Sequence, residues 1–298
     1  MNDIKDPIAP FRSRLLGLAY RMLGSRTEAE DVLQDAYLRI YDATDIANRE
    51  AYLVTTVTRL CIDRLKSAQM RREAYVGPWL PEPVFDVEAL SPQTTLELAE
   101  DLSFALMLVL DRLSPMERAA FLLHDIFDLE FAKVAAVLGK SEAACRQLAS
   151  RARRAVKARR PTEPIPMERQ TALLAAFASA VSNDDLAALM MLLREDAVLL
   201  SDGGGIKLTA LNAIVGADRI ARFIIGTKRK FAGRGLALRH DARTVNGALG
   251  VMTYLGDDVE QVMSLCMDRE GIAAIYIVRN PKKLTHLAAL HSSRATSG

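Results

Sequence analysis

Cationic and hydroxyl side chains recur at helical spacing between residues 141 and 160. On a helical wheel, one side carries Arg146, Ser150, Arg153 and Lys157, and the other carries Ala144, Leu148, Ala152 and Ala155. The stretch holds seven Lys or Arg residues and one acid, Glu142. The apolar side suits close packing, and the cationic side suits the phosphates and base edges of a DNA major groove.

The residues before this stretch complete a helix-turn-helix order. An apolar helical segment at 131–138 is followed by Gly139, so the basic helix comes second. A solvated surface helix is the alternative interpretation. Because the turn context is present, we predict a DNA-binding surface. Its residues are Ser141, Arg146, Ser150, Arg153, Arg154 and Lys157.

A second cationic cluster ends the helix expected at residues 49–74. It consists of Arg59, Arg64, Lys66, Arg71 and Arg72, against the single acid Asp63. One interpretation is favourable pairing of these cations with the helix C-terminal dipole. The other is a nucleic-acid patch that suits a DNA backbone or an opened strand.

The helix expected at residues 27–41 has an acidic outer face that also contains an apolar residue. Its core stripe is Ala29, Val32, Leu33, Ala36 and Ile40, and its outer face is Asp31, Gln34, Asp35, Leu38 and Asp42. A solvated acidic face and a docking surface for a protein with a basic rim are equally consistent with this pattern.

Composition limits the classes of function. The chain has 298 residues, a net charge of +2 and 50% hydrophobic residues, so two or three domains with sizeable cores are expected. Because the N-terminus is polar we expect no signal peptide, and no apolar run in the sequence approaches the length of a membrane span. Three distant cysteines fit a reducing cytoplasm. We expect no metal, no cofactor and a cytoplasmic protein.

The N-terminal half reads as helices interrupted by a proline-rich segment. Helices are expected at 11–23, 27–41 and 49–74, and again from near Leu96, with capping boxes at Thr27–Glu30 and Ser114–Glu117. Residues 76–98 contain four prolines and no Lys or Arg, which predicts an acidic, extended linker. Three further prolines, at 161, 164 and 166, predict a second boundary.

The C-terminal part changes to a mixed pattern. Helices are expected at 167–181, 184–193 and 217–230, with a turn at 202–205. Strands are expected at 197–200, 236–245, 249–254, 259–267 and 272–278. This pattern predicts an α+β domain with a curved antiparallel sheet.

The sequence resembles a known family along much of its length. Residues 19–39 are similar to region 2 of bacterial extracytoplasmic-function sigma factors, and residues 113–157 are similar to region 4. The resemblance covers residues 8–160 in the expected order. Three short motifs resemble signatures of a sigma group with a fused C-terminal SnoaL-like domain: WLPEP at 79–83, DGGG at 202–205 and NPKKL at 280–284. One departure is Ile206, which stands between the glycines and Lys207.

The resemblance implies a multidomain protein with two all-α sigma domains and an α+β SnoaL-like (NTF2-like) domain. The expected boundaries are 1–75 for region 2, 76–98 for the linker, 99–160 for region 4 and 167–290 for the SnoaL-like domain. The implied function is an alternative sigma factor that directs bacterial RNA polymerase to specific promoters.

The resemblance also implies roles for the clusters described above. The residues Asp31, Gln34, Asp35 and Leu38 would dock on the β′ clamp of RNA polymerase. The cations at 59–72 would engage and help open the −10 element, and the basic helix would contact the −35 element.

For the C-terminal domain we expect regulation in cis through contacts with the sigma domains or with the linker. The expected residues are Trp79, Leu80, Pro81, Glu82, Pro83, Asp202, Gly203, Gly204, Gly205, Lys207, Asn280, Pro281 and Leu284. A ligand in a pocket of this domain stays open. One rival is a ligand-sensing helix-turn-helix regulator that binds DNA without polymerase. A second rival is an isomerase or hydrolase that uses His240, Asp241 and Tyr254.

Overall fold

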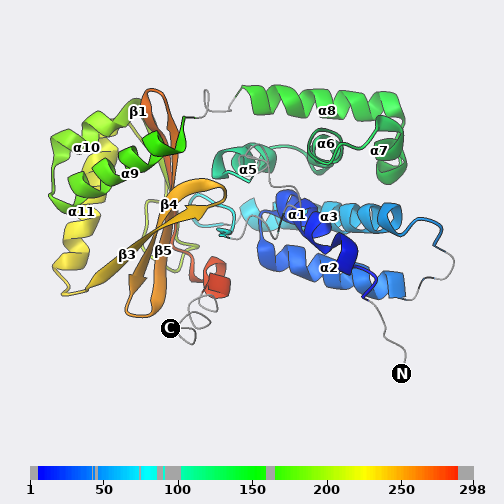
Figure 1. Cartoon of the computed structure of the whole chain (residues 1–298), viewed down its shortest axis with the longest axis horizontal. Coiled ribbons are helices and arrows are strands. Elements are labelled where there is room, and N and C mark those ends of the chain that lie inside the picture. Colours follow the sequence, from blue (N-terminus) through cyan, green and yellow to red (C-terminus); the bar gives the residue numbers. More distant parts are fainter. Residues whose placement is uncertain are drawn as a thin grey trace. The chain divides into compact units, whose positions relative to one another are not determined.

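The computed structural model describes residues 6–41, 43, 46–73, 75–85, 90, 102–158 and 165–287. These residues fall into two compact units, shown in Figure 1. The first unit comprises 1–74, 86–102 and 106–160, and the second comprises 75–85, 103–105 and 161–298. The units therefore interleave along the sequence, because residues 75–85 pack with the C-terminal part of the chain.

The first unit opens with a short 3-10 helix, η1 (Ala9–Phe11), and three α-helices, α1 (Arg12–Leu23), α2 (Arg26–Tyr41) and α3 (Arg49–Glu73). Gly24 ends α1 in the left-handed conformation, at φ 71°. The capping box predicted at Thr27 is wrong, because α2 begins at Arg26 and its cap position is Ser25, two residues before Thr27. The Ser25 hydroxyl accepts the Glu28 backbone N–H at 3.1 Å and takes the cap position.

Among the described residues, five further helical segments follow: α5 (Phe104–Asp111), whose first two residues belong to the second unit, α6 (Pro115–Phe121), the π-helical turn η3 (Leu122–Ile126), α7 (Phe131–Leu138) and α8 (Glu142–Lys157). The capping box at Ser114 and Glu117 is confirmed, with Pro115 in the first turn. Arg118 of α6 is 1% exposed and donates to the Arg21 carbonyl of α1 at 3.0 Å. Helix α1, which comes before residues 75–85, thus packs against α6, which comes after them.

Helices α7 and α8 form the expected helix-turn-helix. Gly139 adopts φ 63° between them, and the Ser141 hydroxyl caps α8 by accepting the Ala144 N–H at 3.3 Å. The buried stripe of α8 is Cys145, Ala149 and Ala152. The wheel centred on Leu148 was therefore wrong in rotation, and Leu148 lies at the edge of the packed face.

The second unit is an α+β fold. Its helices are α9 (Met167–Ser182), α10 (Leu186–Leu192), α11 (Ala217–Ala232) and the 3-10 helix η4 (Pro281–Lys283). Its strands are β1 (Leu193–Asp202), β2 (Ile214–Val215), β3 (Leu238–Val245), β4 (Ala248–Leu255), β5 (Asp258–Asp268) and β6 (Gly271–Val278). They form a six-stranded sheet in the order β2-β1-β6-β5-β4-β3.

The prediction of an antiparallel sheet is wrong for one pair of strands. β1 runs parallel to β6, whereas the other neighbouring strands are antiparallel. The two strands are far apart in sequence, so local alternation of apolar residues gives no information on their pairing. The two-residue strand β2 was not predicted either.

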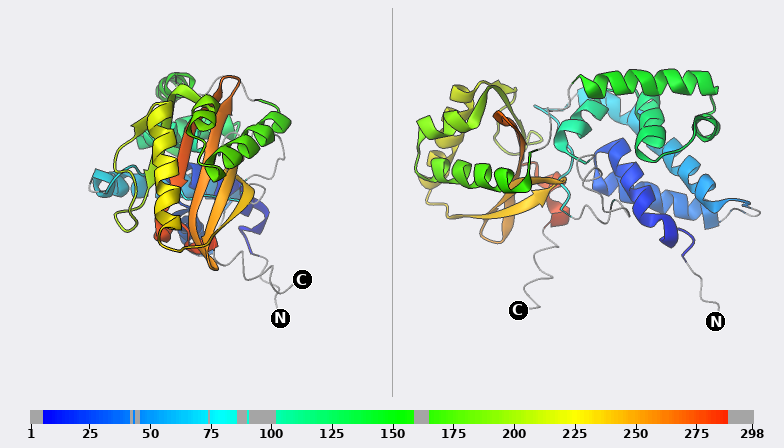
Figure 2. Two further views of the ribbon diagram at one scale, coloured as in Figure 1. Left: turned by 90° about the vertical axis from the view of Figure 1, so that its left-hand side faces the viewer. Right: turned by 45° about the horizontal axis from the view of Figure 1, so that its top comes forward.

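The sheet has two faces with different covers. Helices α9, α10 and α11 lie over one face (Figure 2, left), where apolar side chains such as Phe177, Leu199 and Ile275 form the core. Tyr276 alternates with Ile275 and Ile277 along β6 and so points to the other face. There its ring stacks on Phe104, with ring centroids 5.6 Å apart.

The segment predicted as a linker is partly buried. Leu80 and Val84 are both 0% exposed and Glu82 is 7% exposed, so residues 75–85 are not a solvated spacer. The Val84 N–H donates to the Asn246 side chain at 3.0 Å, and Asn246 N–H donates to the Val84 carbonyl at 2.8 Å. Of the remaining linker, Leu90 is described, and 86–89 and 91–98 lie outside the described residues, as does the helix start expected near Leu96.

Candidate functional site

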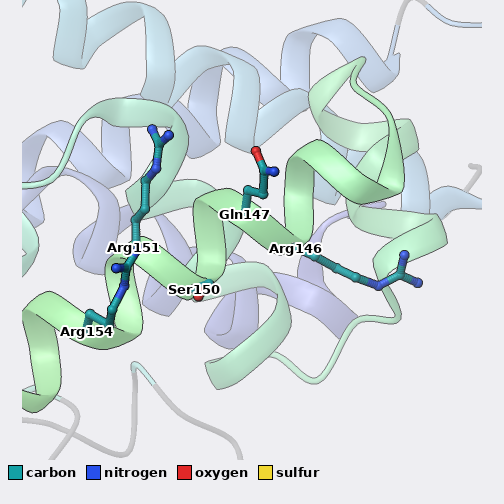
Figure 3. A pocket seen from close by; sticks show the side chains of 5 residues that line it. All are labelled: Arg146, Gln147, Ser150, Arg151 and Arg154. Carbon is teal, nitrogen blue, oxygen red and sulfur yellow. The ribbon is translucent and has the colours of Figure 1, made fainter.

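A shallow pocket on the exposed side of α8 is lined by Arg146, Gln147, Ser150, Arg151 and Arg154. Figure 3 shows these side chains leaving the helix over successive turns. Three guanidinium groups, one amide and one hydroxyl provide donors for phosphates and donors or acceptors for base edges. This chemistry would suit a nucleic-acid interface.

Three of the six residues predicted for this surface line the pocket: Arg146, Ser150 and Arg154. Arg146 is also paired with Glu142 at 2.7 Å and lies over the Phe131 ring. Arg153 is paired with Asp125 of η3 at 2.5 Å. Ser141 is the helix cap described above, and Lys157 is exposed in the last turn of α8.

Gln147 and Arg151 also line this pocket, but they are absent from the set of residues predicted from the sequence. The signal was available in the wheel, because both residues lie opposite a stripe centred between Cys145 and Ala149. A wheel centred on Leu148, the largest apolar residue of α8, places Gln147 and Arg151 beside the apolar stripe instead of opposite to it.

The outer face of α2 presents the predicted acidic and apolar side chains. The five residues predicted for the core stripe of α2 are the buried ones. Leu38 is 61% exposed, and Asp31 and Gln34 are exposed beside it. Asp35 is half-buried and accepts a hydrogen bond from Arg64 of α3 at 2.8 Å. Asp42 lies outside the described residues.

The predicted cations of α3 do not share one environment. Arg59 donates to the Val137 carbonyl of α7 at 3.4 Å, and Lys66 pairs with Asp63 at 3.3 Å. Arg64 faces α2, where its guanidinium also donates to the Glu28 carbonyl at 2.9 Å. The side chains of Arg71 and Arg72 lie outside the described residues.

Within the second unit, the three short motifs meet at the carboxylate of Asp202, which is 0% exposed. One oxygen, Oδ1, accepts from the Tyr75 hydroxyl at 2.6 Å and the Gly204 N–H at 3.0 Å. The other, Oδ2, accepts from the Leu80 N–H at 2.9 Å and from Lys283 Nζ at 2.7 Å. All four acceptor positions of the carboxylate are therefore used.

Lys283 completes this cluster. Its ammonium also donates to the Leu80 carbonyl and lies over the rings of Trp79 and Tyr75, 4.3 and 5.2 Å from their centroids. Burial, together with the hydrogen bond to Asp202, raises the pKa of Tyr75 above its ordinary value, so the hydroxyl stays protonated and donates. We call Tyr75, Trp79, Leu80, Asp202, Asn280 and Lys283 the linker lock. Asn280 belongs to it because its amide donates to the Tyr75 hydroxyl at 2.8 Å.

The glycines after Asp202 are required by close approaches. A Cβ at Gly203 would lie 2.2 Å from the Lys207 carbonyl oxygen, and one at Gly204 would lie 2.3 Å from the Asn280 amide nitrogen. Gly204 and Gly205 both have positive φ. The loop that follows is fastened by Lys207, which pairs with Glu260 at 2.6 Å, while Ile206 before it is exposed.

The remaining motif residues have simpler positions. The Pro83 carbonyl accepts from His286 at 2.9 Å, and Pro281 opens η4. Leu284 is buried, and Pro81 and Glu82 are buried in the linker segment.

The structure does not bring the residues of the enzyme alternative together. His240 and Asp241 are neighbours on β3, so their side chains leave opposite faces of the sheet. His240 lies 3.1 Å from the Thr253 hydroxyl, Asp241 pairs with Arg243, and the Tyr254 ring is covered by Arg239. Burial lowers the pKa of His240.

The described residues were also considered as a possible metal site and as a possible membrane span, and they fit neither. In that part of the chain, no group of three or more His, Cys, Asp or Glu side chains is arranged to hold a metal ion. Nor is any helix built from those residues long and apolar enough to cross a membrane.

Comparisons with known proteins identify both halves of the first unit. Residues 8–71 match the family Sigma-70 region 2, and residues 103–156 match Sigma-70, region 4. The ECF RNA polymerase sigma factor SigJ of Mycobacterium tuberculosis is 42% identical over 287 residues, covering 92% of this chain and 91% of its own. A protein of the same species named as probable ECF RNA polymerase sigma factor SigI is 31% identical, with 93% of each chain covered.

A solved structure extends this likeness to the fold. The crystal structure of the Mycobacterium tuberculosis extracytoplasmic function sigma factor SigJ matches with a TM-score of 0.74 and 35% identity. The match covers 93% of this chain and 98% of the other, so it includes the α+β unit as well as the helical one.

Proposed function

Because the chain belongs to the extracytoplasmic-function family of sigma factors and carries a C-terminal SnoaL-like domain, we propose that separate surfaces of its domains perform the separate functions of an alternative sigma factor. Region 2 docks on RNA polymerase and engages the −10 element, and region 4 engages the −35 element. The SnoaL-like domain regulates both in cis. The rival regulator that binds DNA without polymerase is not favoured, since relatives matched over nearly the whole chain are sigma factors.

The polymerase-docking surface in this proposal is the outer face of α2: Asp31, Gln34, Asp35 and Leu38. The observation that supports it is Leu38, which is 61% exposed in the middle of acidic and amide side chains. An exposed apolar residue with a charged rim is typical of a protein interface, and acids select a basic partner. The β′ clamp of the polymerase is the proposed partner.

For promoter DNA, we assign the −10 element to Arg59, Lys66, Arg71 and Arg72 on α3. The −35 element is assigned to α8. There the pocket residues Gln147, Arg151 and Arg154 join Arg146 and Ser150 as the contacting set, with Arg153 and Lys157 on its border. The Ser141 cap presents the N-terminus of α8, where backbone N–H groups favour a phosphate.

Regulation in cis is supported by the linker lock. Residues 75–85 stand between the two sigma regions in sequence, and yet their backbone and aromatic side chains are bound by Asp202 and Lys283 of the second unit. A covalently attached domain meets its target at an effective concentration near the millimolar range. A looser or tighter linker lock therefore changes how firmly the segment between region 2 and region 4 is held.

We assign no catalytic step and no cofactor to the SnoaL-like domain. The space between its sheet and its helices is occupied by an apolar cluster that includes Phe177, Leu199, Ile225 and Ile275. A catalytic pocket is lined mostly by apolar side chains and also needs a few converging polar groups. We place the protein in the cytoplasm, where its polymerase and DNA partners are.

Binding to core RNA polymerase tests the docking surface. Gln34→Arg adds a positive charge to the outer face of α2 at an exposed position, so we expect weaker binding to core polymerase with little change in melting temperature. Normal affinity of the folded variant for core polymerase would remove this face from the proposal.

A further inference from the structure

Arg64 is a cation of α3 that points at α2 rather than away from it. One guanidinium nitrogen donates to the Glu28 carbonyl at 2.9 Å and lies 3.7 Å from Asp31. The other donates to Asp35 at 2.8 Å. The Arg64 side chain is 26% exposed, so both of its ends are held against the backbone and the acids of the neighbouring helix.

This geometry fixes the orientation of Asp35. A planar guanidinium with a backbone contact at one end has few rotamers left, so the carboxylate at its other end is held in one direction. The side chains of Asp35 and Asp31 remain 46% and 57% exposed. The Arg64 contact uses Oδ2 of Asp35, and a carboxylate has further acceptor positions for an incoming cation.

We propose that Arg64 is a positioning residue for polymerase docking, which holds Asp35 and Asp31 in the orientation that a basic partner surface needs. This inference rests on the docking surface proposed above, and it assigns to Arg64 a role other than contact with the −10 element. A DNA strand would have to displace both the Glu28 carbonyl and the Asp35 carboxylate to use this guanidinium.

The test measures affinity for core RNA polymerase in the absence of DNA, with the full chain. Arg64→Met is expected to weaken binding roughly fivefold, the factor that corresponds to the upper value for a partly exposed ion pair. Arg64→Lys keeps the charge but not the two-ended contact, and is expected to weaken binding as well. In an Asp35→Asn background, Arg64→Met should have a smaller effect than in the wild type, because part of the contribution of Arg64 acts through Asp35.

A matched control is available on α2. Arg26 pairs with Glu30 at 3.1 Å, and the two side chains are 25% and 43% exposed, close to the values for Arg64 and Asp35. Arg26→Met removes a comparable ion pair outside the docking face, so core affinity should stay at the wild-type value.

Either of two results would overturn this inference and leave the docking surface standing. In the first, folded Arg64→Met binds core polymerase like the wild type but is impaired in promoter opening. In the second, the Arg64 and Asp35 substitutions act independently, so that their effects multiply. Leu38→Asp separates this from a failure of the docking surface itself. If Leu38→Asp binds core polymerase like the wild type, the proposed surface falls and the role of Arg64 falls with it.

Discussion

Lys283 and Asp202 form an ion pair that is almost completely buried. Their relative exposures are 7% and 0%, and the same two groups hold the backbone of Leu80. Moving both charges out of water costs free energy. The mutual attraction of the two groups and their additional hydrogen bonds offset this cost. Removing one partner leaves the other charge buried without compensation.

We therefore predict that Lys283→Met lowers the free energy of unfolding of the second unit by about 3–5 kcal/mol, measured by urea denaturation. The control is Lys282→Met, because Lys282 is the exposed neighbour in the same turn. Equal losses in the two variants would contradict the assignment of the effect to the Asp202 pair.

Glu260 gives a prediction on pH dependence. Its burial acts to raise the pKa, but hydrogen bonds from Lys207 and Arg279 outweigh that effect and lower the pKa below its ordinary value. A lowered carboxyl pKa contributes stability above the ordinary value of about 4.3, and this contribution is lost as the pH falls through the lowered pKa.

The difference in unfolding free energy between wild type and Glu260→Gln should thus be constant from about pH 6 upward and shrink below about pH 4.5. Urea denaturation of both proteins at several pH values measures it. A difference that stays the same down to the acid end of the range would contradict the role of this carboxylate.

At the scale of elements, the turn between α7 and α8 depends on the backbone of Gly139. A Cβ at Gly139 meets nothing within 4 Å, so any cost of Gly139→Ala comes from its φ of 63°. We expect a loss of about 1 kcal/mol in the free energy of unfolding. Gly226 of α11 also has open space but no positive φ, so Gly226→Ala should stabilise by about 0.5–1 kcal/mol. Effects of equal sign in the two variants would contradict this account of the turn.

We expect the pocket residues of α8 to contribute to promoter binding in different ways. Arg151→Ala and Arg154→Ala should weaken binding to all promoter sequences alike and reduce the salt dependence, as expected for phosphate contacts. Gln147→Ala should instead change which base is preferred, because an amide can form a bidentate contact with adenine. Transcription from a set of single-base promoter variants measures both effects. An unchanged base preference in Gln147→Ala would remove Gln147 from direct readout.

Much of this element structure was predictable from the sequence, because it depends on local signals. Helix ends at Gly24 and Gly139, the cap at Ser114 and most strands follow from residue type and periodicity. The parallel pairing of β1 with β6 and the burial of residues 75–85 depend on contacts between distant segments, which no local pattern contains. The rotation of α8 was wrong because Ala149 and Cys145, rather than the larger Leu148, meet the neighbouring helices.

The candidate sites divide in the same way. Residue types named the acids of α2 and the cations of α8, but only the structure could pair Arg64 with Asp35 or join Asp202 to Leu80. Tyr75 and Lys283 were not singled out by the sequence, although they are members of the linker lock. Tyr75 lies shortly before the WLPEP motif and Lys283 lies within the NPKKL motif, and these positions were the available signal for their membership.

For the whole molecule, the second unit is built from three separate stretches of sequence. Residues 75–85 and 103–105 belong to it, although they flank or lie within the sigma regions. A truncation near Pro166 would therefore remove the sheet but leave Leu80, Val84 and Phe104 without their buried surroundings. Point variants of the linker lock keep the sheet in the chain, so they test regulation without deleting these surroundings.

Run-off transcription by core RNA polymerase tests the central claim most directly, on a template with a promoter selected by the full chain. The reactions compare no added chain, the wild type, Lys283→Met and Lys282→Met. We predict specific initiation only when the chain is present, with a changed yield for Lys283→Met and the wild-type yield for Lys282→Met. Absence of initiation from every form, together with tight binding to free DNA, would contradict the sigma function, and equal yields from the three forms would contradict control through the linker lock.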